Sequence, residues 1–121
     1  MIELLKGFPE NVLAVRGKGR ITKTDYDTVL VPAIEKALKV HEKVRLYYEI
    51  GPDFDGFELA AAWEDFKVGI ERLTRWQRVA VVTDVDWIKH TMQMFGFLMP
   101  GEMRVFPMAE AQQARAWIDA A

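Results

Sequence analysis

The sequence predicts an α/β fold with a five-stranded, mixed but mostly parallel sheet and four helices, in the order ββαβαβαβα. The strongest support comes from residues 78–107. A β-branched run at 79–83 predicts a strand, a helix is expected to begin near Trp87, and a second strand follows at 103–106. Strand, helix and strand in roughly thirty residues form a βαβ crossover, which requires a helix-covered parallel sheet. The earlier segments also alternate between strand and helix periodicity, and one domain is expected over residues 1–121.

A hairpin is expected at the start of the chain. Residues 2–6 and 11–16 are short apolar runs separated by Gly7-Phe8-Pro9-Glu10. Glycine and proline between two such runs are typical of a hairpin turn. Gly17-Lys18-Gly19-Arg20 is then expected to end the second strand. It lacks the glycine spacing of phosphate-binding loops, so the sequence favours a plain glycine turn.

Positive charges gather around this glycine turn. Arg16, Lys18, Arg20 and Lys23 place four of them within eight residues. Two interpretations are open, namely a solvated loop or a contact with a phosphate or lipid headgroup.

The first helix is expected to be capped by Thr24, with Asp27 as the capping-box partner three residues later. Its apolar face repeats at helical spacing in Tyr26, Val29, Leu30, Ala33, Ile34, Ala37 and Leu38. Pro32 lies inside this pattern. We expect a kink there, unless the first turn begins later, because proline cannot donate the backbone hydrogen bond to Thr28.

A third strand is expected over residues 44–50, followed by the loop Asp53-Phe54-Asp55-Gly56. Such a loop lies at the carboxyl end of a strand, where α/β sheets tend to place their binding sites. With Asp84 and Asp86 after the next strand, four carboxylates could gather there and hold a hard cation such as magnesium. The local sequence favours the other interpretation, in which these aspartates cap helices and close turns, so no metal is expected.

The second and fourth helices each present one apolar stripe. In the second helix the stripe is formed by Leu59, Ala62, Trp63, Phe66, Ile70 and Leu73. In the fourth, expected over residues 109–120, it is formed by Ala111, Ala114, Trp117 and Ile118.

The third helix is unusually apolar. Residues 91–99 carry no charge, and six of these nine residues are Met, Phe or Leu. Helical spacing predicts a packed side made of Trp87, Ile88, Thr91, Phe95 and Leu98. Met94 and Phe97 lie well away from that side and are expected to be exposed. Either a neighbouring segment or a dimer partner covers them, or they receive an apolar ligand or a membrane surface.

The residue inventory removes several classes of function. The chain has no Cys and no Ser, which excludes disulfides, thiolate zinc sites, serine and cysteine nucleophiles, and seryl phosphorylation. His41 and His90 lie on different elements without a positioned partner, so no enzymatic activity and no cofactor are expected. The net charge of −2 argues against a nucleic-acid partner. Because no signal peptide or membrane span is recognisable, a cytoplasmic protein is expected.

Several short motifs together resemble the SpoIIAA-like family of small bacterial proteins with the STAS fold. They are Thr24-Asp25-Tyr26 with Pro32, Trp63-Glu64-Asp65 with Gly69, Ala80-Val81-Val82 with Asp84 and Trp87, Pro100-Gly101-Glu102, and Ala114-Arg115-Ala116-Trp117. Their order and spacing span nearly the whole chain. This family is related in architecture to the CRAL-TRIO lipid-transfer domain.

The resemblance implies a STAS-like domain that binds an apolar small molecule or lipid. It also implies peripheral contact with the membrane as the second and third helices move apart. The expected ligand-binding residues, facing one another across that gap, are Trp63, Phe66, Ile70, Trp87, Met94, Phe95 and Phe97. Asp53, Phe54 and Asp55 are expected to form a loop site.

The alternative function is a regulatory protein-interaction domain. Anti-sigma-factor antagonists of the same fold use a phosphorylated Ser at the start of the second helix. This chain has Asp53-Phe54-Asp55-Gly56-Phe57 in that region, with no Ser or Thr. Such a domain would therefore work without phosphorylation, unless an acidic residue takes the place of the phosphate.

Overall fold

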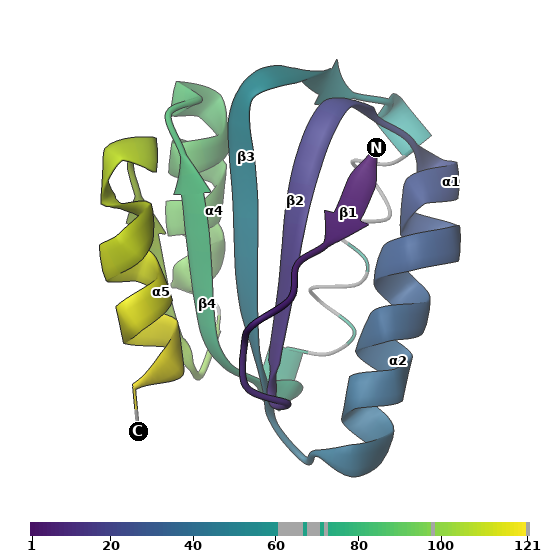
Figure 1. Cartoon of the computed structure of the whole chain (residues 1–121), viewed down its shortest axis with the longest axis vertical. Coiled ribbons are helices and arrows are strands. Elements are labelled where there is room, and N and C mark those ends of the chain that lie inside the picture. The colour runs from purple at the N-terminus through teal and green to yellow at the C-terminus, as the bar shows by residue number, and fades with distance from the viewer. Residues whose placement is uncertain (61–66, 68–70, 72, 98, 121) are drawn as a thin grey trace.

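A five-stranded sheet in the order β1-β2-β3-β4-β5 forms the centre of the fold, with helices on both of its faces (Figure 1). The computed structural model describes residues 1–60, 67, 71, 73–97 and 99–120, with the backbone alone for Leu73 and Phe95. Strands that follow one another along the chain are neighbours in the sheet. The predicted α/β fold with a five-stranded, mixed sheet is confirmed.

The strands pair as the sequence predicts. β1 (Ile2–Leu4) and β2 (Val12–Ile21) form the antiparallel hairpin. β3 (Val44–Phe57), β4 (Trp76–Thr83) and β5 (Glu102–Phe106) then add in parallel, with β3 beside β2 and β5 at the far edge. Parallel neighbours need a crossover connection, and the helices between the strands provide it.

Both β2 and β3 run further than the sequence predicts. β2 continues through Gly17-Lys18-Gly19-Arg20, where a turn was expected, and β3 continues through Asp53-Phe54-Asp55-Gly56, where a loop was expected. The two extensions pair with each other, with shifts in register. Gly19 and Gly56 have positive φ angles of 56° and 118° in these segments. The glycines therefore bend the strands without ending them.

The first predicted helix consists of three consecutive segments that form one continuous helical stretch (Figure 1). They are α1 (Lys23–Asp25), the π-helical turn η1 (Tyr26–Leu30) and α2 (Val31–Val40). Pro32 lies in the first turn of α2, directly after η1. In η1 the Val31 N–H bonds to the carbonyl of Tyr26, five residues back. This widened turn accommodates a proline that cannot donate, and it takes the place of the predicted kink.

The capping box of this helix lies two residues before the predicted one. Thr22 Oγ1 accepts a hydrogen bond from the Asp25 N–H at 3.2 Å, and the Asp25 carboxylate accepts one from the Thr22 N–H at 2.8 Å. The prediction of Thr24 and Asp27 was wrong. Asp27 instead forms an ion pair with Lys23 on the exposed side of the helix.

The later helices are shorter than predicted. α4 spans Asp86–Gly96, and α5 (Ala111–Asp119) follows the 3₁₀ turn η3 (Met108–Glu110). A further 3₁₀ turn, η2 (Leu73–Arg75), precedes β4. In the second predicted helix Leu59, Ala60, Lys67 and Glu71 are helical. Trp63, Phe66 and Ile70 lie outside the described residues, as does Leu98.

The sheet buries a separate apolar layer on each face. On one face Leu30 of η1, Ile34 of α2 and Ile88 of α4 pack against the strands. On the other face α5 packs Ala114 and Ile118 against the sheet. α4 therefore shares its face of the sheet with α2, and α5 covers the opposite face.

The position of the capping box can be tested by alanine substitution. Thr22→Ala should lower the free energy of unfolding by about 1 kcal/mol, because the Asp25 N–H loses its acceptor. Thr24→Ala, at the exposed position predicted from the sequence, is the matched control and should change it by less than about 0.5 kcal/mol. Urea denaturation measures both values. A larger loss for Thr24→Ala than for Thr22→Ala would contradict this assignment.

Candidate functional site

Three aromatic side chains join the end of β3 to the start of α4. The ring centroids of Phe54 and Phe57 are 5.2 Å apart, and they lie 6.3 Å and 5.9 Å from that of Trp87. Two of these contacts are edge-to-face, a geometry that aromatic quadrupoles favour. We call these three residues the aromatic cluster. It fixes the first turn of α4 against the extension of β3.

The exposed side of α4 carries large apolar side chains. Trp87 is 53% exposed, Met94 71% and Phe97 92%. Trp87 and Met94 are seven residues apart, which places them about 20° from one another around the helix axis. Phe97 lies in the turn that ends the helix, where its N–H bonds to the Met94 carbonyl at 3.2 Å. We call Trp87, Met94 and Phe97 the α4 surface.

The opposite side of α4 is buried. Ile88 is 2% exposed, Met92 packs partly against the same apolar layer, and Met99 is buried just after the helix. The helix lies close over β5, because a Cβ added at Gly96 would come within 3.4 Å of the Met103 Cβ. The α4 surface is thus supported from below by packed residues.

The predicted exposure of Met94 and Phe97 is confirmed, and the predicted packed side is partly wrong. Ile88 is buried as expected, but Trp87 is half exposed and Thr91 is exposed. The Trp87 ring packs against Phe54 and Phe57 and not into the apolar layer beneath α4. Thr91 Oγ1 donates to the Trp87 carbonyl at 2.8 Å. Phe95 belongs to α4, but its side chain lies outside the described residues.

Leu59 is more exposed than its place in the predicted helix suggests. The sequence pattern assigns it to the apolar stripe of the second helix, yet it is 86% exposed. The partly buried Phe57 stands two residues earlier and belongs to the aromatic cluster. The apolar pair Phe54 and Phe57 was a signal in the sequence, but Gly51-Pro52 suggested a loop there.

The predicted loop site does not form a carboxylate cluster. Asp53 and Asp55 are exposed residues of β3. Asp84 Oδ1 accepts the N–H of Met108 at 3.1 Å and so anchors η3, and Asp86 pairs with Lys89 at 3.4 Å. No group of three or more His, Asp or Glu side chains within reach of one metal ion is found among the described residues. Asp84 therefore holds η3 and Asp86 forms an ion pair within α4, whereas Asp53 and Asp55 lie within β3 and not in the turn expected before the second helix.

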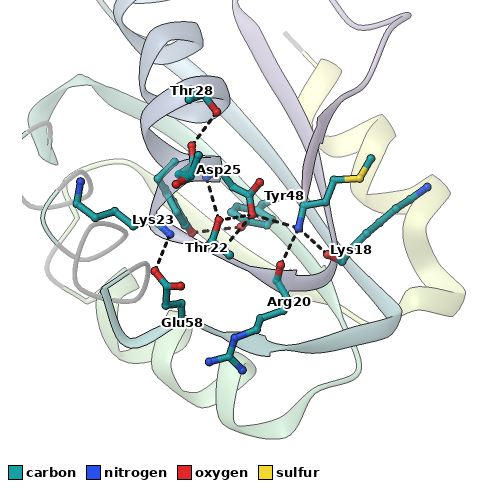
Figure 2. Close-up of polar contacts among 11 residues, drawn as sticks. Lys18, Arg20, Thr22, Lys23, Asp25, Thr28, Tyr48 and Glu58 are labelled. Carbon is teal, nitrogen blue, oxygen red and sulfur yellow. Dashed lines mark hydrogen bonds and ion pairs between the residues drawn. The ribbon is translucent and has the colours of Figure 1, made fainter.

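A polar cluster surrounds the start of the first helix (Figure 2). The Met1 ammonium donates to the carbonyls of Lys18 and Arg20, each at 2.8 Å, and lies 3.2 Å from Asp25 Oδ2. The Lys23 N–H donates to the Glu58 carboxylate at 3.3 Å. These bonds tie β1, β2 and α1 to the residue that follows β3.

The four positive charges of the glycine-rich segment are mostly engaged within the chain. Arg16 Nε lies 2.5 Å from Glu49, and Lys18 lies 3.4 Å from Glu3. Lys23 pairs with an aspartate in its own helix. Arg20 directs its side chain away from the polar cluster in Figure 2. The sequence left open a contact between these residues and a phosphate or lipid headgroup. Such a contact would depend on Arg20 and not on all four positive charges.

Asp25 is the titratable group of this cluster whose pKa is clearly shifted. Burial opposes its ionisation, but hydrogen bonds from Thr22 and the neighbouring Met1 ammonium outweigh burial and lower the pKa. The stabilisation is therefore complete above the unfolded-state pKa, about 3.9. It is lost as the pH falls through the lower folded-state value.

We expect acid to weaken the wild-type fold through Asp25. Below about pH 4 the free energy of unfolding should fall more steeply for wild type than for Asp25→Asn, which has no charge to lose. Urea denaturation at a series of pH values measures this difference. Asp27→Asn, at an exposed ion pair in the same helix, is the control and should follow the wild-type profile. Parallel profiles for wild type and Asp25→Asn would show that Asp25 does not cause the effect.

The two histidines lie on different helices, as the sequence predicts. His41 forms the C-cap of α2, and its carbonyl accepts a hydrogen bond from Arg75 at 3.1 Å. His90 is exposed on α4.

Within the described ranges, none of the helices combines the length and apolar character needed to cross a membrane.

Comparison with known proteins identifies the relatives of this fold. The family model described as SpoIIAA-like matches residues 12–119. A crystal structure of an uncharacterized protein of the DUF3478 family from Shewanella loihica PV-4, which has a SpoIIAA-like fold, superposes with a TM-score of 0.76. The two sequences are 24% identical, and the match covers 98% of this chain and 92% of the other. No curated protein sequence matches the chain.

Proposed function

Because this chain belongs to the SpoIIAA-like family, we propose that it is a non-enzymatic binding module for an acyl chain. The acyl chain comes either from a free lipid or from the surface of a membrane with which the protein associates peripherally. The observation that carries the proposal is the exposure of Phe97 and Met94 at the end of a packed helix. Large apolar side chains grouped on a surface are typical of a partner-binding site.

The two ends of α4 have different roles in this proposal. The aromatic cluster and the buried Ile88 hold the first turns, so Trp87 forms a fixed wall of the site. Met94 and Phe97 supply the area that an acyl chain covers. Methionine suits this role because its unbranched thioether adapts to irregular apolar partners.

The net charge of the chain decides which membrane surface is the suitable probe. The whole chain carries a net charge of −2. An anionic bilayer would repel this charge, whereas a zwitterionic one would not. Vesicles of phosphatidylcholine and a soluble fatty acid therefore separate the two sources of an acyl chain.

The test replaces both exposed apolar side chains with charged ones. Removing a Met or Phe side chain from water contributes roughly 1.5–3 kcal/mol, so Met94→Glu with Phe97→Glu should weaken vesicle or fatty-acid binding at least about a hundredfold. Liposome co-sedimentation and fatty-acid titration measure this loss. The melting temperature should stay near the wild-type value, because both positions are exposed.

The matched control adds the same two charges elsewhere. Gln112 and Gln113 are exposed on α5, on the other face of the sheet. Gln112→Glu with Gln113→Glu should leave binding unchanged. Wild-type protein that binds neither vesicles nor fatty acid would refute the proposal and favour the protein-interaction alternative. A double α4 variant that unfolds would show that Met94 and Phe97 belong to the core.

A further inference from the structure

β5 leaves one edge of the sheet open. Its inner side pairs with β4 in an uninterrupted parallel register, from Arg78 opposite Glu102 to Val82 opposite Phe106. Within the part of the chain that the structure describes, no strand pairs with its outer side. The outer N–H and C=O groups of such a strand are available to a further strand.

Two of the usual devices that protect an edge strand, a proline and a bulge, are missing from β5. The strand contains no proline and no bulge, and Pro107 comes only after its last residue. Met103 and Val105 pack against the core on the α4 side and are only partly buried. The opposite edge, β1, has only three residues, and Glu3 there is paired with Arg16 and Lys18. β5 is therefore the edge that is open to pairing.

The other side of β5 carries one charge of each sign. Arg104 stacks over the Trp117 ring, with its guanidinium carbon 4.8 Å from the ring centroid. Glu102 lies 4.0 Å from Arg78 Nε and is exposed. Residues two apart in a strand point to the same face. Glu102 and Arg104 thus stand side by side on the α5 face, next to the open edge.

We propose that β5 pairs antiparallel with β5 of a second copy of this chain, around a two-fold axis at Met103. This axis sets Glu102 opposite Arg104 of the second copy, and the symmetry repeats the pair. An axis at Glu102 or at Arg104 would instead set like charges opposite each other, which is unfavourable. Among the axes at residues 102–104, the alternation of charge therefore favours the one at Met103, and the two sheets join into one.

The dimer is expected to depend on protein concentration. A five-residue strand pairing, with the partly buried side chains of Met103 and Val105 beside it, is small compared with the roughly 1,000 Å² of a stable interface. The contact is isologous, since each copy supplies the same strand and both charges. It uses none of the residues of the α4 surface, so it stands or falls independently of acyl-chain binding.

Complementary charge reversals test both the partner and the register. Wild-type protein should dimerise with rising concentration in sedimentation velocity. Glu102→Arg alone faces Arg against Arg, and Arg104→Glu alone faces Glu against Glu, so each should raise the dimer Kd roughly tenfold or more. Mixing the two variants should restore association as a heterodimer, because every opposed pair is then complementary.

Each other outcome overturns the proposal. If wild-type protein stays monomeric at all concentrations, β5 does not pair with a second copy of this chain. If the dimer Kd is unchanged in both variants, the interface lies elsewhere. Because Arg104→Glu also removes the stacking on Trp117, melting temperatures check its folding. Glu102→Gln, which leaves Trp117 untouched, provides a second measurement. It should weaken the dimer less than Glu102→Arg, and equal or stronger weakening would count against opposed charges.

Discussion

The parallel pairing of β3 with β2 is the constraint on which the rest of this structure depends. β3 pairs with β4 only as far as Ile50, but its pairing with β2 continues to Phe57. Beyond Thr83 the chain leaves the sheet for α4, so the last part of β3 has a neighbour on one side only. That free side is where Phe54 and Phe57 meet Trp87. The extension of a strand thus determines where α4 begins.

On the face of the sheet opposite α4, two arginines fix the end of α5 to the strands. Arg45 is buried and donates to the carbonyls of Ile118 and Ala120, and Arg78 donates to those of Trp117 and Ala120. The last carbonyls of a helix have no partner within it, so these guanidiniums satisfy the end of α5. Burial and the nearby charge of Arg78 lower the pKa of Arg45. The carbonyls compensate for this cost, and α5 is fixed to β3 and β4.

Buried ionisable groups in the middle of the sheet also have structural partners. Glu49 accepts hydrogen bonds from the Tyr47 hydroxyl at 2.9 Å and from Arg16 at 2.5 Å. Burial, together with Glu49, raises the pKa of Tyr47. Among the described residues, these polar side chains thus stabilise the pairing of the strands.

The order of strands and helices was determined by the sequence, because the apolar period of each segment and the crossover at 78–107 are local properties. The exposure of Phe97 followed from the same spacing, since one helix face cannot bury every apolar residue of α4. Tertiary structure decided the rest. Whether Gly17-Lys18-Gly19-Arg20 is a turn or part of β2 depends on a distant strand that supplies hydrogen bonds. In the same way, Trp87 is half exposed because its ring packs against Phe54 and Phe57. No local pattern encodes a contact between residues so far apart in the chain.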